Sequence, residues 1–336
     1  MLHELKQIVL EYEKARKTGK KTVLATVVNL EGSSYRRPGV RMLLSEDGTM
    51  TGAVSGGCVE KEIWRQAQQL FKSAVPLMMT YDGRYRLGCE GILYILLEPF
   101  DPGEAFIRKF RQHLQQRKPL KIDCSYESGE GISTTSGTVV DFGDQQLPLR
   151  KGYKVVPGGH RFSQELPPCF RLLIIGGEHD AVELSRFAAS TGWEVFVVVN
   201  PMEEKSISDF PGTEQLIPAI PEELDVSAVD SRTAVVLMTH SFVKDLQYLI
   251  ALRNCQTAYF GLLGPSSRRE KLLGALIEHE PDVADHFMDH LRGPAGLNIG
   301  AETPQEIAVS ILAEILAVVR QQQPIPLKDK KGSIHH

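Results

Sequence analysis

Hydrophobic and polar positions in the first hundred residues alternate between two spacings. Residues 1–21 place apolar side chains at helical spacing with charges between them, which predicts an amphipathic helix. Residues 22–29 (TVLATVVN) are nearly continuously apolar and rich in β-branched side chains, a pattern typical of a buried strand. Residues 41–54 predict a hairpin whose turn is supplied by Asp47 and Gly48. This order predicts a small layered α/β domain.

Helical spacing returns after this hairpin, and strand patterns follow it. The apolar positions of the predicted helix are Val59, Ile63, Ala67, Leu70 and Phe71. Residues 77–100 return to strand character, residues 101–118 are helical, and residues 119–165 predict β-hairpins packed on the first domain. Pro167 and Pro168 can neither continue a helix nor join a central ladder, which predicts a linker there.

The second half of the chain repeats a strand, turn, helix and strand pattern. Residues 170–200 contain two buried strands around an amphipathic helix, and residues 233–240 and 258–264 predict two further strands. Such alternation predicts a doubly wound parallel sheet. The last helix is signalled by Thr303 as its N-cap, followed by Pro304 and Glu306.

These patterns together predict an α/β protein with two domains and a flexible tail. We place the N-terminal α/β domain with its β-hairpins at residues 1–165 and the C-terminal Rossmann-like domain at residues 166–323. Residues 324–336 are polar and carry prolines and lysines, which predicts a flexible tail.

Composition and charge exclude several classes of protein. The formal net charge is −4, which gives no electrostatic footprint for nucleic acid. No apolar run approaches the roughly 20 residues that span a bilayer, so stable membrane insertion is not expected. The five cysteines are odd in number and show no CxxC spacing, which argues against a disulfide framework and a structural zinc site. We therefore expect a cytoplasmic protein.

The glycine turn of the second half departs from the dinucleotide-binding fingerprint. Gly176, Gly177 and Ala181 lie close to the pattern G-x-G-x-x-A, but Glu178 occupies the position where the second glycine lets a pyrophosphate approach. The acid expected after the second strand is replaced by Asn200. NAD(P) binding is therefore predicted to be weak or absent, although the fold prediction is unaffected.

Two histidines fall at the carboxyl ends of predicted strands. His179 follows the first strand of the second domain and His240 follows the third. Open α/β sheets bind their ligands at this edge, so both residues are candidates for ligand binding. The alternative is that each is a hydrogen-bonded surface group.

Cys58 follows a Ser-Gly-Gly turn and is expected in the first turn of a helix. The macrodipole and unpaired N–H groups there stabilise a thiolate, and Gly56 and Gly57 let a ligand approach closely. Cys89 repeats the glycine setting in LGCEG. We predict Cys58 as a sulfur ligand for a metal and Cys89 as the second. The alternative is that Cys58 is a small buried side chain.

The loop GSSYRRPGVR supplies candidate anion ligands. Arg36, Arg37 and Arg41 could clamp a phosphate, because guanidinium groups form charge-assisted hydrogen bonds with it. Arg41 begins a predicted strand, so its alternative role is to pair with a nearby acid. A thiolate beside such a clamp suits a ligand that has both a phosphate and a soft metal or sulfur centre.

Long segments resemble a known family in the same order along nearly the whole chain. The segments are residues 25–63 with SGGCVE, residues 87–91, residues 166–181, YFGLLGPSSRREKLL (259–273) and GPAGLNIGAETPQEIAVSILAEILAV (293–318). They resemble the XdhC/CoxI family, accessory proteins of molybdenum hydroxylases. The resemblance implies an N-terminal XdhC/CoxI domain and a C-terminal Rossmann domain. The chain departs from the family pattern at Glu90, Glu178 and Asn200.

The resemblance also implies a function. Family members bind the molybdenum cofactor in its molybdopterin form, support its sulfuration and deliver it to an apo molybdenum hydroxylase such as xanthine dehydrogenase. A cysteine desulfurase is an implied further partner, and a homodimer is the implied assembly. Such proteins are frequently labelled xanthine dehydrogenase, but this chain lacks the cysteine set for iron–sulfur clusters. We therefore predict a non-catalytic or weakly catalytic maturation factor. The alternatives are an NAD(P)-dependent oxidoreductase that uses His179 or His240, and a scaffold for protein interactions.

Overall fold

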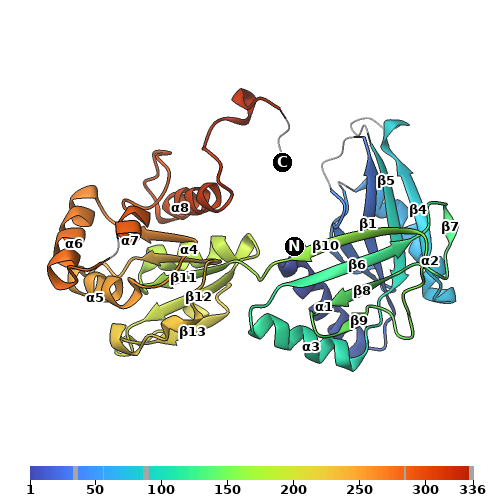
Figure 1. Cartoon of the computed structure of the whole chain (residues 1–336), viewed down its shortest axis with the longest axis horizontal. Helices are drawn as coiled ribbons and strands as arrows, with labels where there is room; N and C mark the ends of the chain where they lie inside the picture. Colours follow the sequence, from blue (N-terminus) through green and yellow to red (C-terminus); the bar gives the residue numbers. More distant parts are fainter. Residues whose placement is uncertain (33–36, 56, 86–90, 284, 333–336) are drawn as a thin grey trace. The chain divides into compact units, whose positions relative to one another are not determined.

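The chain folds into two compact units in a computed structural model. The structure describes residues 1–32, 37–55, 57–85, 91–283 and 285–332. The first unit is Met1–Cys169 and the second is Phe170–His336 (Figure 1). Each unit has its own hydrophobic core.

The first unit contains two antiparallel sheets. The strands of the larger sheet, in spatial order, are β3 (Met50–Gly52), β2 (Arg41–Ser45), β1 (Thr22–Glu31), β5 (Ile92–Pro99), β4 (Leu77–Asp82) and β7 (Gly131–Ile132). The smaller sheet contains β10 (His160–Leu166), β6 (Leu120–Tyr126), β8 (Gly137–Asp141) and β9 (Gln146–Pro148) in that order. The predicted hairpin is confirmed, because β2 pairs with β3 and Leu44 lies opposite Met50.

Helices cover both faces of the larger sheet. The helices are α1 (Leu2–Lys17), α2 (Cys58–Ser73) and α3 (Glu104–Gln115). Strand β1 is almost continuously apolar because its alternate residues enter different cores. Leu24 and Val28 pack with α1, α3 and the smaller sheet, whereas Val23 and Ala25 pack beneath α2. All five apolar positions predicted for α2 are buried, so that prediction is confirmed.

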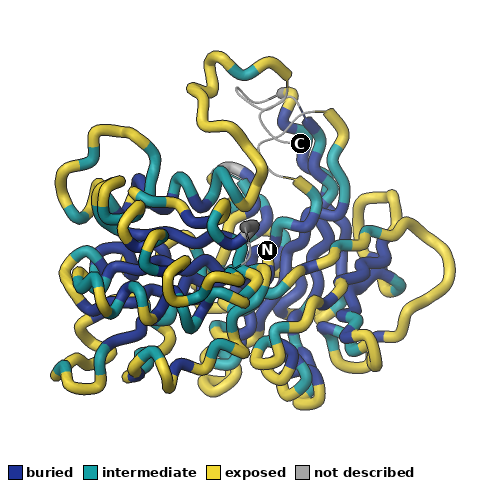
Figure 2. Tube along the Cα trace, turned by 60° about the vertical axis from the view of Figure 1, so that its left-hand side comes forward, coloured by how far each residue is buried: buried dark blue, intermediate teal, exposed yellow. Residues whose placement is uncertain are grey.

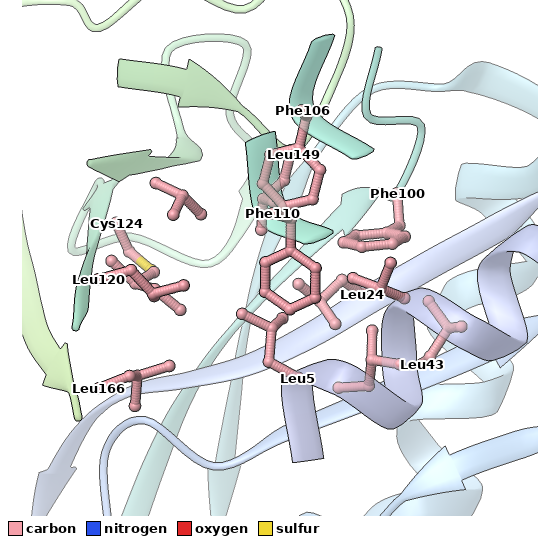
Figure 3. Close-up of a cluster of buried hydrophobic side chains, with 14 of the residues drawn as sticks. Leu5, Leu24, Leu43, Phe100, Phe106, Phe110, Leu120, Cys124, Leu149 and Leu166 are labelled. Carbon is pink, nitrogen blue, oxygen red and sulfur yellow. The ribbon is translucent and has the colours of Figure 1, made fainter. Parts of the chain in front are cut away.

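The core between the two sheets of this unit is aromatic and aliphatic. Figure 3 shows Phe110 of α3 close to Leu5 of α1, in a cluster that also contains Phe106 of α3 and Leu24 of β1, with Cys124 of β6 to one side. Figure 2 shows burial along the trace, with buried strands and exposed connections between them. Polar groups inside this core must therefore find partners there, because water does not reach them.

The second unit is built on a six-stranded sheet. Its strands, in spatial order, are β13 (Gln215–Pro218), β12 (Glu194–Val199), β11 (Arg171–Ile175), β14 (Thr233–Leu237), β15 (Tyr259–Leu262) and β16 (Leu291–Arg292). All neighbouring pairs are parallel. This order is that of the Rossmann fold, with the change of direction between β11 and β14.

Helices pack on both faces of this parallel sheet. The helices are α4 (His179–Ser190), α5 (Phe242–Leu252), α6 (Ser266–His279), α7 (Asp285–His290) and α8 (Pro304–Val319). Helices α4 and α8 share one core with Ile174 of β11, while α5 and α6 share the other core with Ile175. The predicted doubly wound α/β fold is confirmed. None of the helices in the described ranges is long and apolar enough to cross a membrane.

Candidate functional site

Helix α2 begins at the cysteine that the sequence analysis selected. Its first residue is Cys58 and its N-cap is Gly57, whose φ of 111° suits glycine. The prediction that Cys58 lies in the first turn is confirmed. A Cβ atom built on Gly57 meets no atom of the described residues within 4 Å, so these residues leave the space beside this backbone free. Gly56 lies outside the described residues, as does the side chain of Cys58.

The backbone at this helix start is held by a carboxylate. Glu60 accepts hydrogen bonds from the N–H groups of Ser55 and Gly57, at 2.5 and 2.7 Å. The carboxylate therefore takes backbone donors that a bound anion would otherwise use.

Of the other candidate ligand residues in the first unit, some lie outside the described residues and one is exposed. Cys89 and Arg36 lie outside the described residues, so their distance from Cys58 stays a prediction. Arg37 is exposed, and its carbonyl accepts a hydrogen bond from the N–H of Val40. An exposed guanidinium at this turn is compatible with an anion ligand.

Arg41 lies inside the first unit, at the start of β2. Only 4% of its surface is exposed, and its Nη1 donates hydrogen bonds of 2.8 Å to the carbonyl of Gly39 and to Gln164. Burial lowers the pKa of this guanidinium. These contacts tie the end of the arginine loop to β10, and they favour the structural role of Arg41 over phosphate binding.

A buried polar cluster surrounds Arg41 and was not expected from the sequence. Thr138 donates a hydrogen bond through its hydroxyl and another through its backbone N–H to Glu98, and the hydroxyl also lies 3.3 Å from the sulfur of Cys124. Burial raises the pKa of Glu98 and raises that of Cys124 to about 11, while the nearby Arg41 opposes the second shift. Cys124 is fully buried and protonated at neutral pH, so it is no nucleophile.

The glycine turn of the second unit is tightly packed. Gly176 has a φ of 135°, and a Cβ atom on it would lie 2.4 Å from the carbonyl oxygen of Met238, which follows β14. A Cβ atom on Gly177 would lie 3.1 Å from a carboxylate oxygen of Glu203 and 3.2 Å from Val199. Both glycines therefore serve close packing between the carboxyl ends of neighbouring strands.

Side chains occupy most of the space in front of this turn. Glu203 lies within salt-bridge distance of Lys244, at 3.7 Å, and both line a cavity of only about 20 Å³ together with Glu178 and Asn200. Such a volume holds about one water molecule. Asn200 accepts a hydrogen bond from the N–H of Met202. The geometry supports the prediction that NAD(P) binds weakly or not at all.

The two histidines are brought to the same edge of the sheet. His179 is exposed as the first residue of α4, and His240 follows β14 with a φ of 55°. Nε2 of His240 lies 3.5 Å from a carboxylate oxygen of Asp180. His240 is half exposed, whereas Asp180 is largely covered. These two residues belong to no larger cluster, because the described residues contain no group of three or more His, Cys, Asp or Glu suited to a metal.

A buried network behind His240 was not predicted from the sequence. Asp245 is buried and accepts hydrogen bonds from Thr239, at 2.6 Å, and from Arg268, at 2.7 Å. This network links the loop after β14 to α6. An acid in the first turn of α5 was the available signal, but its partner Arg268 comes 23 residues later.

The fold and these helix starts define a two-unit α/β protein whose second unit is a Rossmann-type domain. Residues 172–315 match the XdhC Rossmann domain, and residues 15–82 match the XdhC and CoxI family. The chain belongs to the XdhC/CoxI family, as its resemblance to that family implied.

Known relatives are similar to the chain over most of their length. A Bacillus subtilis protein, named as a probable subunit of xanthine dehydrogenase, is 32% identical over 88% of this chain and 92% of its own. The molybdenum cofactor insertion chaperone PaoD of Escherichia coli is 26% identical over 91% of this chain and 86% of its own. A crystal structure described as a xanthine dehydrogenase from Bacillus halodurans has a TM-score of 0.74 at 27% identity, covering 95% of this chain and 96% of that one.

Proposed function

We propose that this protein is an accessory factor that binds the molybdenum cofactor, supports its sulfuration and inserts it into a molybdenum hydroxylase of the xanthine dehydrogenase type. The cofactor is cargo in this proposal. A cysteine desulfurase would supply the sulfur. The relative described as a cofactor insertion chaperone supports the accessory role, since it aligns with 91% of this chain.

The start of α2 is the observation that carries the proposal for the first unit. Cys58 begins a helix of 16 residues, and no atom of the described residues lies within 4 Å of where a side chain on Gly57 would begin. A thiolate in this position is a soft donor suited to molybdenum or to sulfur transfer. Arg37 is exposed and remains a candidate for the cofactor phosphate.

The alternative function, an NAD(P)-dependent oxidoreductase, gains no support from the geometry. The space before the glycine turn is about 20 Å³, and Glu203 adds a second carboxylate beside Glu178. Two carboxylates near the phosphate position disfavour a pyrophosphate by like-charge repulsion. We therefore retain the accessory function alone.

Cofactor retention by the full chain tests the proposal. The protein is incubated with molybdenum cofactor released from a molybdenum hydroxylase, passed over a desalting column, and assayed for molybdenum and pterin. We expect retention by the unaltered protein, and a loss of at least tenfold in Cys58→Ser, which keeps size but removes the soft donor. Cys255→Ser, a half-buried thiol of the second unit, is the matched control and should retain cofactor normally. Equal retention by Cys58→Ser would show that Cys58 is only a packing residue.

A further inference from the structure

A pocket of about 560 Å³ lies in the second unit, away from the glycine turn. It is formed where two of the segments that resemble the family come together after the carboxyl ends of β15 and β16. Its lining residues are Leu263, Gly264, Pro265, residues 294–301, Ile307 and Ser310. Small-molecule sites have volumes of roughly 300–1,000 Å³ and favour this edge of a parallel sheet. Volume and position both fit a ligand site.

One wall of the pocket is fixed by hydrogen bonds to the sheet and to α8. The N–H of Ala295 donates to the carbonyl of Leu262 at 2.9 Å, and Ser310 donates to the carbonyl of Leu297 at 2.6 Å. Glu314 accepts from the N–H of Gly296 at 2.8 Å and from the hydroxyl of Tyr259 at 2.6 Å. The wall is therefore pre-formed, which reduces the entropy lost on ligand binding.

The chemistry of the lining is apolar and uncharged. Leucine, isoleucine, proline and alanine dominate it, and none of the described residues that line it is acidic, basic or histidine. Residues 298–301 form no hydrogen bond within the described part of the chain, so their backbone groups and the Asn298 amide can bond to a ligand. Apolar walls with a few amide groups suit a flat ring with a hydrogen-bonding edge.

We propose that this pocket binds the uncharged heterocyclic ring of a pterin or a purine. Both contain a fused pyrimidine ring with two apolar faces and an amide-like edge. The ring would lie between the apolar side chains, with its edge toward the backbone of residues 298–301. The choice of a pterin as one source rests on the proposed function, whereas the pocket and its chemistry do not.

The glycine turn explains why the ligand is a single ring system rather than a dinucleotide. The cavity before Gly177 has a volume of about 20 Å³, and Glu203 and Lys244 lie in front of it. A pyrophosphate bridge from the β15 pocket would meet these side chains. The glycine turn after β11 and the pocket after β15 therefore differ. Of these two places, as far as the described residues show, only the pocket after β15 has room for a ligand.

Binding of pterin and guanosine to the full chain tests the proposal. Pterin fluorescence is titrated with protein, and guanosine and NADH are added as competitors. We expect saturable pterin or guanosine binding that weakens at least tenfold in Ala301→Trp, which fills the pocket. Val309→Trp lies on α8 outside the lining, is 44% exposed in the unaltered protein, and should bind within twofold of it. Ile299→Trp, at a residue 53% exposed, replaces Ala301→Trp if that variant does not fold.

The outcomes separate this proposal from the proposed function. Saturable binding of either ring that is lost in the pocket variants supports the pocket, and the preferred ring identifies the source. The proposal is overturned if neither ring binds, if the filled variants bind normally, or if NADH binds a hundredfold more tightly than either ring. If molybdenum is retained but no ring binds, only the pocket proposal fails. If a ring binds but molybdenum is not retained, the pocket proposal stands and the proposed function fails.

Discussion

Two helices of this protein begin after a glycine pair, and the two glycine turns do different things. At α2 a Cβ atom on Gly57 would meet none of the described residues, and the carboxylate of Glu60 holds the backbone N–H groups. At α4 a Cβ atom on Gly176 would collide with the backbone, and one on Gly177 would touch Glu203 and Val199. The first turn leaves surface for a ligand, whereas the second turn uses its glycines for packing.

This difference changes what a glycine motif says about function. The fold around α4 is that of a dinucleotide-binding domain, but side chains fill the space where the phosphates would lie. The start of α2 does not carry the dinucleotide-binding fingerprint, but the described residues leave the space beside Gly57 free. A glycine pair before a helix therefore predicts a sharp turn, and the surrounding side chains decide whether a ligand can enter.

The largest expected effect is that of an added methyl group at the packed turn. Gly176→Ala should lower the free energy of unfolding by about 3–5 kcal/mol, because backbone strain and a clash with the Met238 carbonyl act together. Gly57→Ala adds only the strain of its positive φ and should cost about 1–2 kcal/mol. Urea unfolding of both variants measures the difference. Equal costs would show that the two turns are packed alike.

The sequence predicted most of the fold because its strongest patterns are local. The closing helix begins at Pro304, its N-cap Thr303 accepts a hydrogen bond from the N–H of Glu306, and Glu306 accepts in return, so the predicted capping box is confirmed. Strands β13 and β16 were missed, since they contain four and two residues and β13 ends in a proline. Short edge strands carry too few alternating positions to be recognised.

The candidate site was less predictable, because it depends on residues that are distant in sequence. Glu178 was identified from the fingerprint, but the contact of Glu203 with Gly177 requires the turn after β12 to fold back over β11. The pocket after β15 joins segments about thirty residues apart. The buried Arg41 donates a hydrogen bond to Gln164, which lies 123 residues later in the chain. No local pattern contains such information.

A second prediction concerns Cys124, the buried thiol in the core of the first unit. The folded-state pKa of Cys124 is about 11, above that of an unfolded thiol, so its contribution to stability is complete below about pH 8.5. As the pH rises toward 11, the unfolded state ionises first and stability falls, by about 3 kcal/mol from this group. Cys124→Ala should therefore lose stability less steeply over this range.

Unfolding in urea at several alkaline pH values measures the slope. Burial also raises the pKa of Tyr12 and Tyr248, so these groups add to the same alkaline slope and the comparison is made between variants. Cys255→Ala is the matched control, because Cys255 is only half buried and its pKa is raised by burial alone. If Cys124→Ala and the unaltered protein had parallel slopes, Cys124 would not be protonated in the folded state at high pH.

A third prediction sharpens the contrast by removing the carboxylate cap of α2. Glu60→Gln weakens two charge-assisted hydrogen bonds to Ser55 and Gly57 and should cost about 1–2 kcal/mol of stability. Removing the negative charge should also speed the reaction of the Cys58 thiol with iodoacetamide at neutral pH. Glu62→Gln, on the same helix, weakens an ion pair with the exposed Arg65 and should change neither property appreciably. Slower reaction in Glu60→Gln would show that the carboxylate organises the thiol rather than repelling its charge.

The smallest expected effect concerns nucleotide binding at the packed turn. The unaltered protein should bind NAD(H) weakly or not at all, and tight binding measured by calorimetry would contradict this reading of the turn. Glu178→Gly removes bulk and like charge and should strengthen any residual binding, but only a few-fold, because Glu203 still lies beside Gly177. Removing that second carboxylate as well, by Glu178→Gly with Glu203→Ala, should strengthen binding further than either change alone. If the single Glu178→Gly variant already bound as tightly as the double variant, Glu203 would be no obstacle, and the difference between the two glycine turns would come from Glu178 alone.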